Sequence, residues 1–351
     1  MKKTFLLGIC ITFFCFQGCN SSSDNTPQDM LSDPYTYQQW YLDKNDVFYY
    51  EHAINDDAHI HLSSLGRIYS GKDVKVAVID DGLDTNHPDL YKAVIASYDI
   101  KTKTTDVSPT YFNDYHGSAV TGIIAARENY IGVLGVAHNV SIIFLKYKSS
   151  MTESETIELF DKAEEFGADI ISCSWGTYDV SDAVRDKIVD LSHNGRDGKG
   201  TLIVFAVGND DYNLDDYNDE SSIPEVIAVG ATTKENIRAG YSNYGTSLDI
   251  VAPGGYYLSL PTLDVSGDRG ENSGDYILYN GNFSGTSAAA PIVSGALALL
   301  LEENPDLTHD EVVEILHLRS DKIGNVVYDE NGFNSYYGYG KLNVSNILNL
   351  K

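Results

Sequence analysis

Short, nearly unbroken runs of apolar residues alternate along this chain with longer segments of helical pattern. The apolar runs are rich in β-branched residues, as in parallel strands buried on both faces; they are residues 74–80, 141–147, 169–175, 201–208 and 226–231. The helical segments between and after them are residues 116–126, 152–167, 181–195, 287–302 and 308–319. This alternation predicts an α/β fold with a doubly wound, mainly parallel sheet and helices on both faces. In such folds, active sites lie at the carboxyl ends of the strands.

Local signals refine this picture. Thr152 followed by Glu155 is a capping box, and Gly167 is expected to end the same helix. The acidic segment 209–221 and the Gly/Tyr/Asp-rich segment 254–282 are expected to be surface insertions at one end of the sheet. No internal repeat is visible, and one domain is predicted.

The N-terminus has the pattern of an export signal. An apolar run from Thr4 to Phe16 follows a basic start and is too short to span a bilayer as a mature helix. The Gly-Cys pair ending at Cys19 resembles a bacterial lipoprotein cleavage box; the alternative is an ordinary signal cut nearby. We predict export to the cell envelope on a lipid anchor at Cys19, or to the exterior. The expected parts are a signal peptide over 1–18, a flexible tether over 19–32 and a folded domain over 33–351.

Charge and cysteine content narrow the classes of function. The full chain has a formal net charge of −27, which excludes general nucleic-acid binding through a basic patch. Cys173 is the one cysteine that follows Cys19, so the domain has no disulfide framework despite its predicted export. Its place in an apolar run predicts a small core residue rather than a nucleophile.

Three polar residues stand where the predicted strands end or a helix begins. Asp80 ends the first apolar run, where a buried carboxylate needs a partner to stay ionised, and an imidazole would serve. His116 opens a predicted helix and is followed by Gly117, which lets other groups approach the ring closely. Asn209 follows another strand, and its amide could donate a hydrogen bond into the cleft.

Ser287 stands at the junction between a Gly-Thr-Ser turn and a long apolar helix. Unpaired N–H groups at a helix N-terminus favour a developing negative charge. Pro291 has no N–H to donate to the carbonyl of Ser287, so the first turn is expected to be distorted near the hydroxyl. Ser287 is therefore either a rigidly mounted nucleophile or only a helix cap.

Three segments together resemble the signatures of the subtilisin-like serine protease family. They are "VAVIDDGLDTNHPDL", "HGSAVTGIIAA" and "GTSAAAPIVSGALAL", in the order Asp, His, Ser, with "FAVGND" before the last. The resemblance covers residues 33–345 and implies a subtilisin-like fold and hydrolysis of peptide bonds. It makes Ser287 the nucleophile, His116 the general base and then acid, and Asp80 the residue that orients the imidazole. Asn209 and the backbone N–H of Ser287 would bind the oxyanion.

Because every catalytic position is intact, the resemblance favours a serine endopeptidase acting on proteins or peptides. The alternative is a catalytically idle, subtilisin-shaped binding protein. Ser174, Trp175 and Gly176 are expected to form an edge that pairs with the substrate backbone by strand addition. For Trp175, packing in the core is the other interpretation.

Substrate choice is predicted from a further similarity to kexin and furin, carried by "DPYTYQQWYL", by "SWG" and by the acid after Asp80. It implies cleavage after Lys or Arg. Asp81 and Asp114 would face the residue before the cleaved one, and Asp179 the cleaved residue itself. A second acid for that pocket is expected from four candidates, which are Asp211, Asp215, Asp216 and Asp219. The rival prediction is broad cleavage after apolar residues.

Calcium and a folding partner are also implied by the resemblance. The family's first calcium site is matched by the side chains of Asp33, Asp89 and Asn129, with backbone oxygens around Ile131 and Val133. A turn-capping role is the alternative for Asp89. Relatives fold with a prodomain, which the stretch between Cys19 and Asp33 is too short to hold, and parallel sheets fold slowly. A separately encoded chaperone or calcium-assisted folding is therefore expected.

Overall fold

The computed structural model describes residues 33–62, 68–147 and 150–349. The predicted signal peptide of residues 1–18, the anchor at Cys19 and the tether of residues 19–32 lie outside the described residues.

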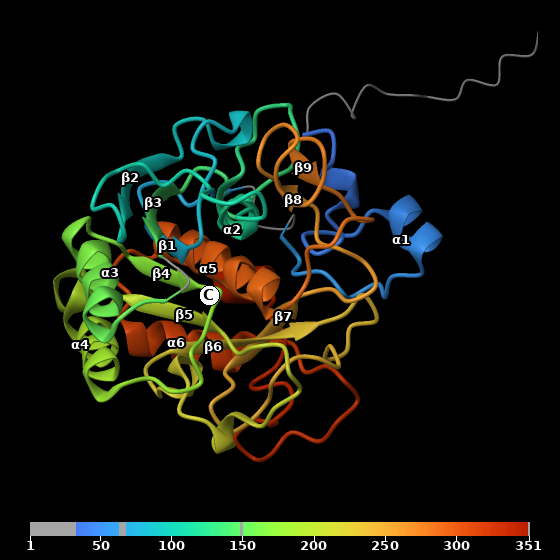
Figure 1. Ribbon diagram of the computed structural model, residues 1–351. Helices are drawn as coiled ribbons and strands as arrows, with labels where there is room; N and C mark the ends of the chain where they lie inside the picture. The colour runs from blue at the N-terminus through green and yellow to red at the C-terminus, as the bar shows by residue number, and fades with distance from the viewer. Residues whose placement is uncertain (1–32, 63–67, 148–149, 350–351) are drawn as a thin grey trace, which may run out of the picture. The chain divides into compact units, whose positions relative to one another are not determined.

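A seven-stranded parallel sheet lies at the centre of the domain, in the order β2-β3-β1-β4-β5-β6-β7 (Figure 1). Its strands are β1 (Lys75–Asp80), β2 (Val94–Asp99), β3 (Ser141–Lys146), β4 (Ile170–Cys173), β5 (Leu202–Ala206), β6 (Ile227–Thr232) and β7 (Ile250–Pro253). The strand order reverses between β1 and β4, so the carboxyl ends of these two neighbours flank the crevice where doubly wound sheets bind ligands. A separate antiparallel pair is formed by β8 (Thr262–Leu263) and β9 (Tyr276–Ile277).

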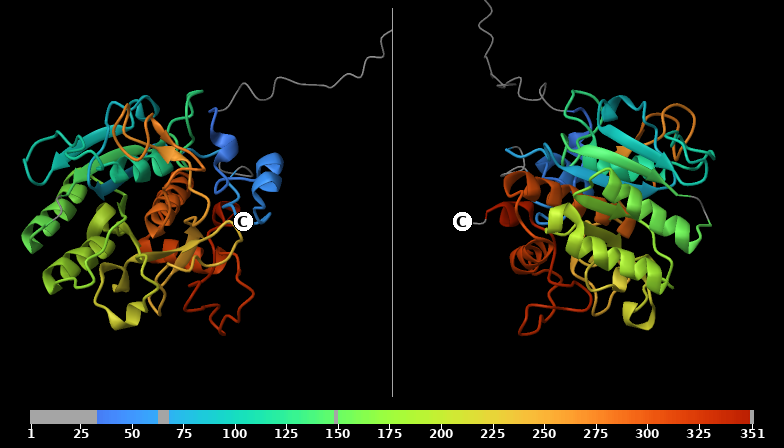
Figure 2. Two further views of the ribbon diagram at one scale, coloured as in Figure 1. Left: turned by 45° about the vertical axis from the view of Figure 1, so that its right-hand side comes forward. Right: turned by 90° about the vertical axis from the view of Figure 1, so that its left-hand side faces the viewer.

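Helices cover both faces of the sheet, as predicted (Figure 2). They are α1 (Asp46–His52), α2 (His116–Ala125), α3 (Glu153–Glu165), α4 (Asp182–Gly198), α5 (Thr286–Glu303), α6 (His309–Arg319) and α7 (Val344–Leu348). Alternate residues of β1 enter two cores because successive side chains of a strand point to opposite faces. Val76 and Val78 pack with α2 and α5 in one core, and Ala77 and Ile79 pack with α3 and α4 in the other.

Helix α5 runs through the larger core. By length and composition it could cross a membrane, but 83% of that apolar segment is buried within the domain, as in the core helix of a folded protein. It begins at Thr286, one residue before Ser287, and packs against β4, β5, β6, β7 and α2. The apolar helix therefore carries Ser287 on a buried support.

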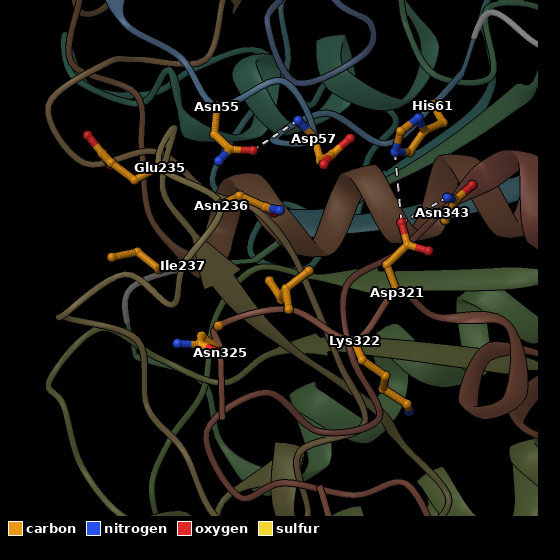
Figure 3. Close-up of a pocket in the computed structure, with 12 residues that line it drawn as sticks. Asn55, Asp57, His61, Glu235, Asn236, Ile237, Asp321, Lys322, Asn325 and Asn343 are labelled. Atoms are coloured by element: carbon orange, nitrogen blue, oxygen red, sulfur yellow. Dashed lines mark hydrogen bonds and ion pairs between the residues drawn. The ribbon is translucent and has the colours of Figure 1, made fainter. Parts of the chain in front are cut away.

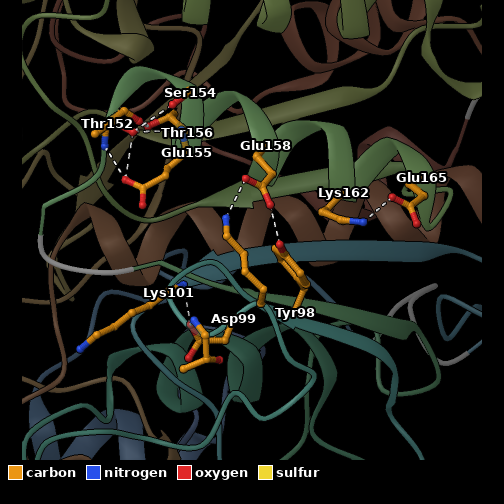
Figure 4. Close-up of polar contacts among 12 residues, drawn as sticks. Tyr98, Asp99, Lys101, Thr152, Ser154, Glu155, Thr156, Glu158, Lys162 and Glu165 are labelled. Atoms are coloured by element: carbon orange, nitrogen blue, oxygen red, sulfur yellow. Dashed lines mark hydrogen bonds and ion pairs between the residues drawn. The ribbon is translucent and has the colours of Figure 1, made fainter.

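Helix α3 shows how the sequence signals work locally (Figure 4). The Thr152 hydroxyl accepts a hydrogen bond from the backbone N–H of Glu155, and Glu155 accepts one from the N–H of Thr152, which confirms the capping box. Glu158 accepts hydrogen bonds from the hydroxyl of Tyr98 at 2.5 Å and from Lys103 at 2.8 Å, so the helix is tied to edge strand β2.

Several elements were not predicted from the sequence. Strand β2 is half-exposed, so polar residues interrupt its apolar run, and β7 has only four residues.

Helix α1 starts where the Asn45 side chain accepts a hydrogen bond from the N–H of Phe48. In α4 the backbone leaves the helical region from Gly195 to Asp197. Four short 3-10 helices complete the fold, at Thr36–Gln38, Pro88–Leu90, Leu214–Asp216 and Glu220–Ser222.

Candidate active site

Strand β1 ends at Asp80, and helix α2 begins at His116 beside it. The imidazole Nδ1 lies 2.9 and 3.1 Å from the two carboxylate oxygens of Asp80, which is only 1% exposed. Gly117 makes this approach possible, because a Cβ there would lie 2.3 Å from the carbonyl oxygen of Gly82 and 3.1 Å from the Asp80 Cβ. The predicted Asp–His pair is therefore formed.

The charges of Asp80 and Asp81 control the protonation of His116. Burial disfavours the imidazolium, but the charge of Asp80, its hydrogen bond and the charge of Asp81 outweigh burial and raise the pKa of His116 to about 9. Asp81 accepts a hydrogen bond from the N–H of Gly117 at 2.8 Å. Burial, and then the charge of Asp80, raise the pKa of Asp81 to about 7.

Ser287 and Ser174 hold each other through reciprocal hydrogen bonds. The Ser287 hydroxyl donates to the carbonyl of Ser174 at 3.2 Å, and the Ser174 hydroxyl donates to the carbonyl of Ser287 at 3.1 Å. The second bond supplies the donor that Pro291 cannot provide. Among the described residues, the Ser287 hydroxyl bonds Ser174 rather than His116. His116 thus stands at the end of β1 and Ser287 beside the end of the neighbouring strand β4, and no direct hydrogen bond joins them in this structure.

The side chain of Asn209 is oriented by Thr286, a residue that the sequence analysis did not single out. Its Oδ1 accepts hydrogen bonds from the N–H of Thr286 at 2.9 Å and from the hydroxyl at 3.1 Å. The same hydroxyl accepts from the N–H of Gly208 at 3.1 Å. With Oδ1 held, the amide nitrogen is the group left to donate to a ligand beside Ser287.

A cavity of about 320 Å³ adjoins Ser287 and Asn209. Its acidic lining residues are Asp210 and Asp219, whereas the predicted Asp179 is exposed and does not line it. Asp219 is buried and accepts hydrogen bonds from the N–H of Ser221, the hydroxyl of Ser221 and the N–H of Tyr178. A Cβ on Gly176 would lie 2.7 Å from the Asp219 Oδ2, so a glycine there leaves room for this carboxylate. Asp211, Asp215 and Asp216 are not among the lining residues.

A second cavity, of about 490 Å³, lies beside the first. Asp81 and Asp114 both line it, as predicted, together with Lys101 and Lys146. Lys146 is buried and already donates to the carbonyl of Ser108 and the hydroxyl of Thr110, at 2.5 and 2.7 Å.

Trp175 and Gly176 line both cavities. The indole N–H of Trp175 donates to the carbonyl of Ile79 at 3.0 Å, and its ring packs edge-on against Phe205 at 5.1 Å between ring centres. Trp175 thus combines the two predicted roles, as a wall of the cleft and a partner of the core.

The predicted calcium ligands Asp33, Asp89 and Asn129 come from three segments that meet, with the two carboxylates buried. Asp33 Oδ1 accepts from the N–H of Asn129 at 3.0 Å, and Asn129 Oδ1 accepts from the N–H of Ile131 at 3.0 Å. Asp89 Oδ2 accepts from the N–H of Val133 at 3.1 Å. The other Asp89 oxygen is buried without a partner among the described residues.

This cluster fits a hard cation. Asp33 is 2% exposed and Asp89 is fully buried, and burial, followed by the charge of Asp33, raises the pKa of Asp89 to about 7. Two carboxylates, a side-chain amide and nearby backbone oxygens are the ligands that calcium prefers. In the described part of the chain, no three His, Cys, Asp or Glu side chains are grouped to hold a metal. The predicted site contains only two such side chains, Asp33 and Asp89, because its other ligands are an asparagine amide and backbone oxygens. His87 is not one of the predicted ligands: its ring accepts a hydrogen bond from the N–H of Asp89 and so has a structural role.

Another cavity, of about 640 Å³, is lined by none of the predicted site residues (Figure 3). Its polar walls include His61, which lies 3.8 Å from Asp321, and several asparagines. None of Asp80, Asn209 and Ser287 lines it.

The comparisons with known proteins agree with this geometry. Residues 71–340 match the Subtilase family, and the chain belongs to that family. A calcium-dependent protease of Trichormus variabilis is 32% identical over 343 residues, which cover 89% of this chain and 51% of that protein. A dibasic-processing endoprotease of Yarrowia lipolytica is 30% identical over 348 residues, which cover 91% of this chain and 34% of that protein. The chain thus spans about half and about a third of these relatives.

The fold is shared with solved structures. A serine protease of Aeromonas sobria, solved with a chaperone, matches with a TM-score of 0.79 at 22% identity, covering 91% of this chain and 67% of that one. The subtilisin-like fold predicted from the sequence is therefore confirmed.

We expect the imidazole of His116 to titrate near pH 9 rather than at the ordinary value of about 6.5. Asp81→Asn should lower this pKa, because it removes a negative charge that favours the imidazolium. The measurement is an NMR titration of the histidines in a Ser287→Ala background, which prevents self-digestion. Asp114→Asn serves as the control, since its carboxylate accepts from the N–H groups of Thr110 and Tyr111. If the pKa of His116 does not change in Asp81→Asn, the charge of Asp81 does not act on His116 as assigned here.

Proposed function

We propose that this chain is a serine endopeptidase. The observation that carries the proposal is the pair formed by buried Asp80 and half-buried His116 at the end of β1, with Ser287 on the first turn of α5 beside the end of neighbouring strand β4. Hydrolysis of peptide bonds by an Asp-His-Ser set requires these three groups close together, and here they gather at one edge of the sheet.

Because the pKa of His116 is about 9, the imidazolium of the free enzyme must first lose a proton, so activity should rise with pH toward that value. In the proposed mechanism, neutral His116 then takes the proton from the Ser287 hydroxyl through its Nε2 as Ser287 attacks the scissile carbonyl. Asp80 keeps the Nδ1 proton in place and stabilises the imidazolium. The amide nitrogen of Asn209 and the N–H of Ser287 stabilise the oxyanion. His116 then donates its proton to the leaving amine, and water hydrolyses the acyl-enzyme by the same steps in reverse. The substrate must first draw the Ser287 hydroxyl away from the carbonyl of Ser174.

Ser287→Ala should leave the fold intact and lower kcat by at least about 10⁴-fold. The measurement is cleavage of a fluorogenic peptide, with the melting temperature as the check on folding. Labelling of the unaltered chain by a fluorophosphonate tests the rival function, a catalytically idle binding protein. Peptide binding with neither labelling nor turnover would establish that rival.

We further propose cleavage after Lys or Arg. Asp219 and Asp210 line the cavity beside Ser287, and Asp81 and Asp114 line the adjoining one. A partly desolvated carboxylate favours a basic side chain because an apolar one leaves the charge unpaired. The name of the Yarrowia lipolytica relative, a dibasic-processing endoprotease, also supports this preference. Broad cleavage after apolar residues is the rival.

Asp219→Asn should lower the ratio of kcat/KM for Ala-Arg over Ala-Phe peptides by about 10- to 100-fold, since it removes the buried charge beside Ser287. Asp179→Asn is the matched control, because Asp179 is exposed and outside the cavity, and it should leave the ratio unchanged. A ratio that falls with Asp179→Asn instead would restore the sequence-based assignment of that residue.

Calcium is proposed to bind at Asp33, Asp89 and Asn129. The buried, unpartnered oxygen of Asp89 supports this, as does the name of the Trichormus variabilis relative, a calcium-dependent protease. When bound, the ion would neutralise two buried carboxylates and hold their segments in place. No catalytic step depends on it.

Chelation should lower the melting temperature of the Ser287→Ala protein by about 5–10 °C relative to calcium at about 100 times its Kd. Asp89→Asn should abolish most of this response. Asp264→Asn is the control: Asp264 is equally buried but accepts three backbone N–H groups elsewhere, so the response to calcium should remain. Identical melting curves with and without chelator, in protein shown by elemental analysis to be free of metal, would disprove the site.

Export and assisted folding complete the proposal. The signal-like residues 1–18 and Cys19 support export and lipid anchoring. The Aeromonas sobria protease was solved with a chaperone, which supports a folding partner for this chain as well.

A further inference from the structure

Tyr178 lies in the segment after β4, and its side chain reaches the loop after β5. Its φ of 60° lies in the left-handed region, which is uncommon for a bulky residue and costs about 1–3 kcal/mol. The conformation directs the backbone N–H to the Asp219 Oδ2 at 2.9 Å, while the phenol hydroxyl donates to the carboxylate of Asp210. One strained residue therefore contacts both carboxylates of the cavity beside Ser287.

The two carboxylates differ in how they are held. Asp219 is buried and accepts three hydrogen bonds, so its position is fixed without the Tyr178 side chain. Asp210 is exposed, and the phenol of Tyr178 is its side-chain partner among the described residues. An exposed carboxylate without a partner is free to turn into solvent. The phenol is thus what keeps Asp210 at the cavity.

The Tyr178 ring is itself held by its surroundings. Tyr212 and Tyr217 stack on each other, and both meet the Tyr178 ring edge-on, at 6.4 and 5.5 Å between ring centres. Gly208 is also close: a Cβ there would lie 2.8 Å from the phenol oxygen, so only glycine admits the hydroxyl. Burial, and then the bond to Asp210, raise the pKa of Tyr178 to about 12, so the phenol stays a donor.

We propose that Tyr178 is a specificity-determining residue that holds Asp210 as the second carboxylate of the cavity beside Ser287. This inference rests on the proposed cleavage after basic residues. Asp219 and Asp210 together present two negative charges to the cleaved residue, and the Tyr178 ring lines the wall between them. A lysine or arginine side chain would pair its charge with these carboxylates and pack its apolar stem on the ring.

The test is kcat/KM of the whole chain on two peptides that differ only in Arg or Phe before the cleaved bond. Tyr178→Phe keeps the ring and releases Asp210, so kcat/KM for the Arg peptide should fall about tenfold while that for the Phe peptide stays the same. Asp210→Asn should cause a similar fall, and the double variant no more than either single one, because both remove one interaction. Tyr217→Phe is the control, since that hydroxyl makes no hydrogen bond among the described residues, and it should change neither value.

Equal losses on both peptides would overturn the proposal, because they would mean that Tyr178 acts on the oxyanion loop or on stability rather than on specificity. Additive losses in the double variant would also overturn it. If the preference for the Arg peptide is unchanged in Tyr178→Phe, the role of Tyr178 is wrong, while the proposed cleavage after basic residues still stands. A wild-type enzyme that prefers Phe and is unaffected by Asp219→Asn overturns the proposed basic specificity as well.

Discussion

The structure depends on the burial of α5. This helix is apolar on almost every side, so it has to lie between the sheet and the other helices. Its first turn then emerges at the carboxyl ends of the strands, where Ser287 meets the segment after β4. Pro291 leaves the Ser287 carbonyl without its helical donor, and the Ser174 hydroxyl replaces it. One hydrophobic constraint thus fixes the helix, the nucleophile candidate and the neighbouring strand end.

The interior strands could be predicted from the sequence because burial on both faces leaves a continuous apolar run. The runs at 74–80 and 201–208 correspond to β1 and β5 for this reason. Edge strand β2 could not be found in this way, since one of its faces is partly open and polar residues interrupt it. The β8–β9 pair, with two residues in each strand, depends on tertiary contacts that no local pattern encodes.

The same division applies to the site. Asp80, His116 and Ser287 stand at element boundaries, and a boundary fixes where a side chain lies. The acids of the cavity beside Ser287 stand in loops, whose paths depend on long-range contacts. Sequence spacing therefore pointed to Asp179 and left Asp219 as one of four candidates, whereas the loop after β5 brings Asp219 and the unpredicted Asp210 to the cavity. The role of Thr286 was equally hidden, because it depends on the side chain of Asn209 in a segment far along the chain.

The shared wall formed by Trp175 and Gly176 has a consequence for how a peptide is read. Since both residues border the two neighbouring cavities, a side chain that displaces the indole in one cavity alters the shape of the other. The indole is also bonded to the carbonyl of Ile79, directly before Asp80. If the two cavities receive adjacent residues of a peptide, as proposed, the preferences at those two positions are coupled through this shared wall.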